Sequence, residues 1–128
     1  MPSPEEIRAV VTRYLEAMSA GDKEGYVALF APDATIEDPV GTDVHRGHDE
    51  IRAFWDMVHT LSSSITLMPT GPARVAGREV AFPMQAISDV GGSKVVVDII
   101  DVFALDDEGR ITSMRAFWDP AEMRPYEG

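Results

Sequence analysis

Eleven consecutive residues decide the predicted fold: Val95-Val96-Val97-Asp98-Ile99-Ile100-Asp101-Val102-Phe103-Ala104-Leu105. A run of β-branched and apolar residues predicts a strand, whose side chains point alternately to its two faces. One face of this strand carries Asp101 among five apolar residues, which are Val95, Val97, Ile99, Phe103 and Leu105. Such a face is expected to lie against the protein core, so we expect Asp101 to be buried there.

Asp101 has no basic partner on this predicted face, since no lysine, arginine or histidine shares it. Burying an ionised carboxylate among apolar side chains costs on the order of several kcal/mol unless the charge is paired, so the group usually takes up a proton instead. A carboxyl group that stays neutral at pH 7 is a hydrogen-bond donor, which is useful in catalysis. Asp98 lies on the opposite face of the same strand, where we expect it to be solvated.

Further strands are predicted on both sides of this segment, because turn signals rich in glycine and aspartate separate short β-prone runs. The expected strands cover residues 65–68, 74–75, 80–88, 94–104 and 110–118. Consecutive strands joined by short turns indicate an antiparallel meander.

The first half of the chain is predicted to be helical. Ser3-Pro4-Glu5-Glu6 forms a capping box, and the apolar spacing after it predicts one amphipathic helix that ends at Gly21. Asp22 is expected to cap a second helix, and a third is expected from about Asp49. The inward faces of the three helices are expected to carry Ile7, Val10, Val11, Tyr14, Leu15 and Met18; Tyr26, Val27, Leu29 and Phe30; and Ile51, Phe54, Trp55 and Val58.

Three helices followed by antiparallel strands predict an α+β fold in a single domain that covers residues 1–128. The helices would cover the concave face of a curved, mostly antiparallel sheet and leave an apolar pocket between the two layers.

Asp38 is a second acidic residue on a predicted buried face. It follows a short extended piece in which Ala34 and Ile36 share its face, while Glu37 points away. Pro39 restricts Asp38 to an extended backbone, which fixes the direction of its side chain. Tyr14, Asp38 and Asp101 are therefore candidate functional residues, although a packed tyrosine, a turn aspartate and a structurally paired aspartate are the alternatives for each one alone.

Composition excludes several classes of protein. The 128 residues include 22 acidic and 11 basic ones, and the formal charge of −11 argues against nucleic acid and anionic membranes as partners. The chain has no cysteine, no visible secretory signal at its beginning and no apolar stretch near the ~20 residues that span a bilayer. We therefore expect a cytoplasmic protein.

Metal and cofactor sites are not expected. His45 and His48 lie with Asp43 and Asp49 in a glycine-containing loop that lacks the helical spacing of known zinc motifs. The sequence also has no glycine-rich phosphate loop and no GxSxG nucleophile motif.

The chain resembles the bacterial ketosteroid isomerases of the NTF2-like (SnoaL-like) superfamily almost from end to end. The resemblance is carried by Arg13-Tyr14, by the segment Ala31-Pro32-Asp33-Ala34-Thr35-Ile36-Glu37-Asp38-Pro39-Val40-Gly41, by Ile100-Asp101-Val102-Phe103, and by the segment from Gly109 to Trp118. It implies a cone-shaped α+β fold, a homodimer, a hydrophobic steroid as the small-molecule partner, and no cofactor.

The resemblance also implies roles for three residues. Asp38 would be the general base that moves a proton within the steroid, while Tyr14 and a protonated Asp101 would donate hydrogen bonds to the dienolate oxygen. A neutral aspartic acid in an oxyanion hole is a known example from this family. At Trp55 many of these isomerases carry a tyrosine that supports the catalytic one, and an indole N–H can only donate.

The remaining predicted site residues are apolar side chains that would form the walls for the steroid, although plain core packing is the alternative for most of them. They are Val11, Met18, Phe30, Trp55, Val58, Phe82, Met84, Val97, Ile99, Phe103, Met114, Ala116 and Trp118. The resemblance places Trp118 beside Asp38. Two other functions stay open: a non-catalytic NTF2-like module for ligand binding or dimerisation, and a dehydratase or cyclase that acts on another fused-ring substrate.

Overall fold

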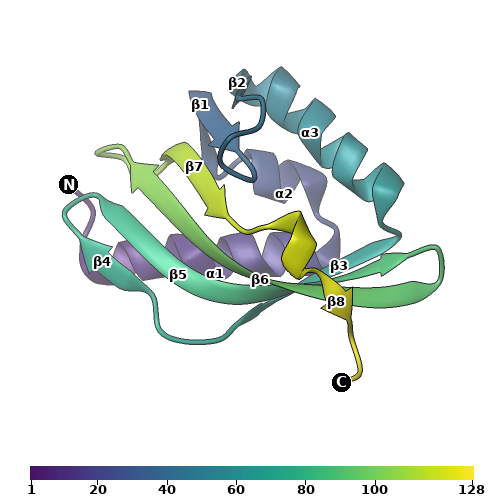
Figure 1. The fold of residues 1–128 in the computed structure, drawn as a ribbon. Helices are drawn as coiled ribbons and strands as arrows, with labels where there is room; N and C mark the ends of the chain where they lie inside the picture. Colours follow the sequence, from purple (N-terminus) through teal and green to yellow (C-terminus); the bar gives the residue numbers. More distant parts are fainter.

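The structure, a computed structural model of residues 1–128, consists of three helices on one side of a strongly curved sheet (Figure 1). The helices are α1 (Pro4–Ala20), α2 (Lys23–Val27) and α3 (Gly47–Leu61), and η1 (Pro120–Glu122) is a short 3₁₀ turn. The strands are β1 (Phe30–Glu37), β2 (His45–Arg46), β3 (Ser64–Pro69), β4 (Arg74–Ala76), β5 (Glu79–Val90), β6 (Ser93–Leu105), β7 (Ile111–Phe117) and β8 (Arg124–Pro125). The predicted α+β fold is confirmed.

Helix α1 begins and ends as its sequence predicts. The Ser3 hydroxyl accepts the backbone N–H of Glu6 at 3.1 Å, and the Glu6 carboxylate accepts the N–H of Ser3 at 2.9 Å, which completes the capping box. Gly21 ends the helix in the left-handed conformation, with φ of 69°. Both ends of α1 are thus defined by capping residues, and the side of the helix that carries Tyr14 faces the core.

The sheet has the strand order β2-β1-β7-β6-β5-β3, with β4 paired to β5 and β8 paired to β6. All pairs are antiparallel except β1 and β7, which run parallel. Strands β5 and β6 form one long hairpin in which Phe82 lies opposite Asp101. The ends of β1 and β7 therefore lie side by side, and this brings together residues that are about eighty positions apart in the sequence.

Two predicted boundaries were wrong. Phe30 belongs to β1 and not to the second helix, which is only one turn long. Phe30 lies opposite Ile111 on β7, so pairing with a distant strand overrides the local helical pattern. The segment 40–47, expected as a loop, contains β2, whose residues pair with Thr35 and Ile36.

The core lies between the helices and the concave face of the sheet. An aromatic group fills it, with the Tyr14 ring 5.0 Å from the Phe103 ring and 5.7 Å from the Tyr26 ring. On the opposite face of the sheet Ile100 and Phe117 are paired neighbours and remain 50% and 41% exposed. The homodimer stays a prediction, in which this exposed pair would face the second copy.

None of the three helices has the length and apolar character needed to cross a membrane.

Candidate active site

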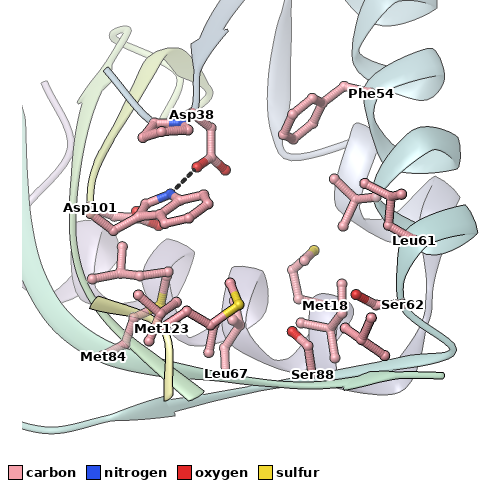
Figure 2. Close-up of a pocket in the computed structure, with 18 of the residues that line it drawn as sticks. Met18, Asp38, Phe54, Leu61, Ser62, Leu67, Met84, Ser88, Asp101 and Met123 are labelled. Carbon is pink, nitrogen blue, oxygen red and sulfur yellow. Dashed lines mark hydrogen bonds between the residues drawn. The ribbon is translucent and has the colours of Figure 1, made fainter. Parts of the chain in front are cut away.

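A cavity of about 480 Å³ opens between α3 and the concave sheet (Figure 2). Twenty residues line it and fifteen of them are hydrophobic, as is typical of a site for an apolar small molecule. Six lining residues carry polar side-chain atoms, and they are Tyr14, Asp38, Ser62, Ser88, Asp101 and Trp118. The three residues that the sequence singled out thus meet at one cavity.

Asp38 reaches the cavity from the end of β1. Ala34 and Ile36 are buried on the same side of this strand, as the alternation predicts. Asp38 is joined to Pro39 by a cis peptide bond, and the next backbone N–H, that of Val40, donates to the carbonyl of Ala116 on β7 at 2.8 Å. The direction of the Asp38 carboxylate is therefore set by both strands.

Trp118 follows directly after β7 and lies beside Asp38. Its indole N–H donates a hydrogen bond of 2.6 Å to the Asp38 carboxylate (Figure 2). Burial raises the pKa of Asp38 above its usual range, while this hydrogen bond and the nearby His45 work in the opposite direction. Asp38 remains partly exposed, so water and a ligand can reach it.

Asp101 is fully buried, with 0% of its surface exposed, and neither of its carboxyl oxygens has a hydrogen-bond partner in the protein. Burial, and then the negative charge of Asp38, raise the pKa of Asp101 well above its usual range, while the Tyr14 hydroxyl opposes the shift. Burial therefore favours the neutral, protonated form of Asp101. Its unpaired O–H group can donate to a ligand in the cavity.

Tyr14 comes to the same wall from the middle of α1. Its ring is held by edge contacts with Phe103 and Phe82, at centroid distances of 5.0 and 6.1 Å. Burial, and then the charge of a nearby Asp101, raise the pKa of Tyr14 well above its usual range, so the hydroxyl keeps its proton. The cavity thus combines one carboxylate that can ionise with two protonated donors.

The family model of the SnoaL-like domain matches residues 11–114, which is most of the chain. The chain belongs to the SnoaL-like family. It is 42% identical to the steroid Delta-isomerase of Nocardioides simplex over 118 residues, which cover 92% of this chain and 94% of that protein. This SnoaL-like chain is also 24% identical to the epoxide hydrolase LasB of Streptomyces lasalocidi, over 95% of its own length and about half (51%) of LasB.

Two solved structures share the fold of this SnoaL-like protein. SalBIII, described as an epoxide hydrolase/cyclase-like enzyme in pyran ring formation in the polyether salinomycin, superposes with a TM-score of 0.89 at 31% identity, over 98% of this chain and 100% of SalBIII. RV0760c from Mycobacterium tuberculosis superposes with a TM-score of 0.85 at 23% identity, over 97% of this chain and 98% of its own. The second likeness supports the fold alone.

Only part of the predicted apolar wall lines the cavity. Six of the predicted residues do so: Met18, Val58, Met84, Val97, Ile99 and Trp118. The other seven are buried in the core and do not line it: Val11, Phe30, Trp55, Phe82, Phe103, Met114 and Ala116. For these seven a contact with the substrate stays a prediction, because alternation gives the face of a strand or helix but not the place along it that borders the cavity.

Several lining residues were not predicted. Met57 and Leu61 lie three and seven positions after Phe54 on α3, so helical spacing could have found them. Ser88 lies four positions after Met84 on β5 and therefore on the same face of the strand, so the alternation of side chains could have found it. Ser62 and Met123 lie outside the longer helices and strands, where the spacing of residues does not predict the direction of a side chain.

Tyr26 occupies the space between Tyr14 and Trp55. Its ring centroid is 5.7 Å from that of Tyr14 and 4.9 Å from that of Trp55. Burial, and then the charges of Asp38 and Asp101, raise the pKa of Tyr26 well above its usual range. The chain therefore has a tyrosine next to Tyr14 although position 55 is a tryptophan.

Proposed function

We propose that this protein isomerises 3-oxo-Δ5-steroids to 3-oxo-Δ4-steroids without a cofactor. The observation that carries the proposal is an apolar cavity in which one ionisable carboxylate, Asp38, shares the space with two groups that keep their protons, Tyr14 and Asp101. The 42% identity to a protein named steroid Delta-isomerase gives independent support.

In the proposed mechanism Asp38 is the general base. It takes a proton from C4 of the steroid, between the 3-ketone and the 5,6 double bond, and the electron pair of the C–H bond moves toward the ketone oxygen. The resulting dienolate is protonated at C6 by the same carboxyl group, which restores Asp38 and leaves the conjugated 4,5 double bond. The proton is thus conserved and no external acid, base or oxidant is consumed.

Tyr14 and Asp101 would stabilise the negative charge that develops on the ketone oxygen. Donors that are fixed in an apolar cavity stabilise an oxyanion more than water does, because they need no reorganisation during the reaction. The raised pKa values of both groups support this role, since each must keep its proton while Asp38 gives up its own. The hydrogen bond from Trp118 supports the ionised form of Asp38.

The direct test uses purified protein with 5-androstene-3,17-dione. We expect the ultraviolet absorbance of the conjugated enone to rise in proportion to the enzyme concentration. No conversion above the buffer rate would exclude the steroid isomerase.

Opening of an epoxide is the second candidate function, and the fold neighbour SalBIII at 31% identity favours it. Neutral Asp101 could protonate an epoxide oxygen while Asp38 removes the proton of an attacking hydroxyl group. His45 does not line the cavity, although its charge lowers the pKa of Asp38. Conversion of a hydroxy-epoxide to a cyclic ether, with no steroid turnover, would support epoxide opening in place of steroid isomerisation.

Tight steroid binding without turnover would instead indicate a non-catalytic module.

We expect the substitution Trp118→Phe to move the acidic limb of the kcat/KM profile to higher pH. The change removes the N–H that donates to Asp38 at 2.6 Å, while an aromatic ring remains in the cavity wall. Hydrogen bonds to charged groups contribute about 1.5–3 kcal/mol, which corresponds to a shift of about one to two pH units. The measurement is the pH–rate profile of the variant beside that of the wild type. An unshifted limb with a lower plateau would show that Trp118 only shapes the cavity.

A further inference from the structure

The polar residues of the cavity are divided between its two ends. Asp38 and Asp101 lie at one end, whereas Ser62 and Ser88 lie close together at the other, beyond Met18 (Figure 2). The rest of the wall is apolar apart from the Tyr14 hydroxyl and the Trp118 N–H. A ligand that spans the cavity would therefore meet polar groups at both of its ends and apolar groups along its body.

The register of the sheet shows how far apart the two ends are. Ser88 on β5 lies opposite Val95, whereas Phe82 on the same strand lies opposite Asp101. Six residues of extended strand correspond to about 20 Å at roughly 3.3 Å per residue. Only an elongated molecule can reach the polar groups at both ends.

The chain path brings the two serines together. Ser62 is the first residue after α3, and the backbone N–H of the next residue, Ser63, donates to the carbonyl of Asp89 at 2.9 Å. Two positions further on, Ile65 pairs directly with Ser88. The beginning of β3 thus fixes the end of α3 against the part of β5 that carries Ser88.

Both serine side chains lie where a ligand in the cavity can reach them. Ser62 is only 8% exposed and Ser88 is half-buried, and both line the cavity. By contrast, the hydroxyl of Ser63 donates to Asp89, and that of Ser19 accepts the N–H of Leu67 at 3.1 Å. A serine hydroxyl in an apolar cavity wall can donate a hydrogen bond to a ligand atom or accept one from it, so the pair is suited to a ligand oxygen.

We propose that Ser62 and Ser88 bind an oxygen atom at the end of the substrate that is remote from the reacting ketone. The inference rests on the proposed isomerase function, because that reaction places the 3-ketone at Tyr14 and Asp101. The far ring of the steroid, with its C17 atom, then points toward the two serines. A hydroxyl group both donates and accepts, so the preferred substrates are 3-oxo-Δ5-steroids with a ketone or hydroxyl group at C17.

The test compares two substrates that differ only in the distal oxygen, 5-androstene-3,17-dione and androst-5-en-3-one. For the wild type we expect kcat/KM to favour the dione by about three- to tenfold, the value of one net hydrogen bond. In the double variant Ser62→Ala/Ser88→Ala this preference should disappear, so that the dione and the deoxy substrate have the same kcat/KM. The matched control is Ser64→Ala, because Ser64 is exposed on β3 and does not line the cavity. Equal preference in the wild type and the double variant would overturn the proposal.

A binding experiment separates this inference from the isomerase function. Phenolic steroids resemble the dienolate at ring A and need no turnover, so estrone and 17-deoxyestrone can be compared by calorimetry. Suppose that neither substrate reacts, but estrone binds more tightly than 17-deoxyestrone and this difference is lost in the double serine variant. The isomerase proposal then fails and the distal oxygen site stands. If both substrates react, and estrone and its deoxy form bind equally, the serine proposal alone is overturned. If neither phenol binds, a steroid is not the ligand and both proposals fall.

Discussion

Replacing Asp38 by asparagine is expected to lower kcat by about 10²- to 10⁴-fold, the usual contribution of a positioned general base. The amide has nearly the shape of the carboxylate, so the backbone at Pro39 and the hydrogen bond from Trp118 can be kept. An amide cannot take up the C4 proton, however, and no other carboxylate lines the cavity except Asp101, which holds its own proton. The measurement is steady-state turnover of 5-androstene-3,17-dione, together with the circular dichroism spectrum of the variant.

The neighbouring residue Glu37 offers a matched control. It is one position away on β1, but its carboxylate points away from the cavity, where it accepts the N–H of Gly41 at 2.9 Å and pairs with Arg115. Glu37→Gln should therefore leave turnover within about twofold of the wild type, as surface ion pairs contribute little. If Asp38→Asn keeps full activity, or if Glu37→Gln loses as much, then Asp38 is not the base.

The part of the site that could be predicted from the sequence is the part that follows from local periodicity. The alternation of β6 was enough to bury Asp101, and the spacing of α1 was enough to bury Tyr14. For Asp38 the strand pattern and the following proline together gave the direction of the side chain. These three positions depend on which face of an element a residue lies on, and a sequence states this directly.

What could not be predicted depends on contacts between distant segments. The parallel pairing of β1 with β7 placed Phe30 in a strand, and no local signal records this pairing. The approach of Ser62 to Ser88 depends likewise on the junction between α3 and β3 and on the pairing of β3 with β5. Phe82 and Phe103 were assigned to the correct face, but their rings pack on each other at 5.0 Å in the core and do not line the cavity.

The substitution Asp101→Leu is the second change for which a large effect is expected, and its effects on activity and stability should have opposite signs. Loss of one oxyanion donor is expected to lower kcat by about 10²- to 10³-fold. The free energy of unfolding should rise by about 1–3 kcal/mol, because the change removes a buried polar group that has no partner. The added methyl groups have room, since Asp101 borders the cavity. Turnover and urea denaturation at pH 7 measure the two effects.

The gain in stability should depend on pH. The pKa of Asp101 is raised in the folded protein, so above the unfolded value of about 3.9 the unfolded chain releases a proton that the folded chain keeps. The wild type therefore loses stability as the pH rises from about 4 toward the raised pKa of Asp101. Asp38 contributes in the same direction but is present in both proteins. The difference between Asp101→Leu and the wild type should thus be smallest near pH 4 and should grow toward neutral pH.

A third protein, Asp101→Asn, distinguishes a neutral donor from a charged group. Asparagine is uncharged at every pH and keeps an N–H donor at nearly the same place, so it should retain more activity than leucine does. If Asp101 acts instead as an anion, asparagine and leucine should be equally damaging. Asp98 provides the control on the same strand, because it is exposed and already bound to Gln85 and Arg124, and Asp98→Asn should change neither turnover nor its dependence on pH. A large loss of stability in Asp101→Leu would mean that the carboxyl group has a structural partner, and the proposed oxyanion site would then retain Tyr14 alone.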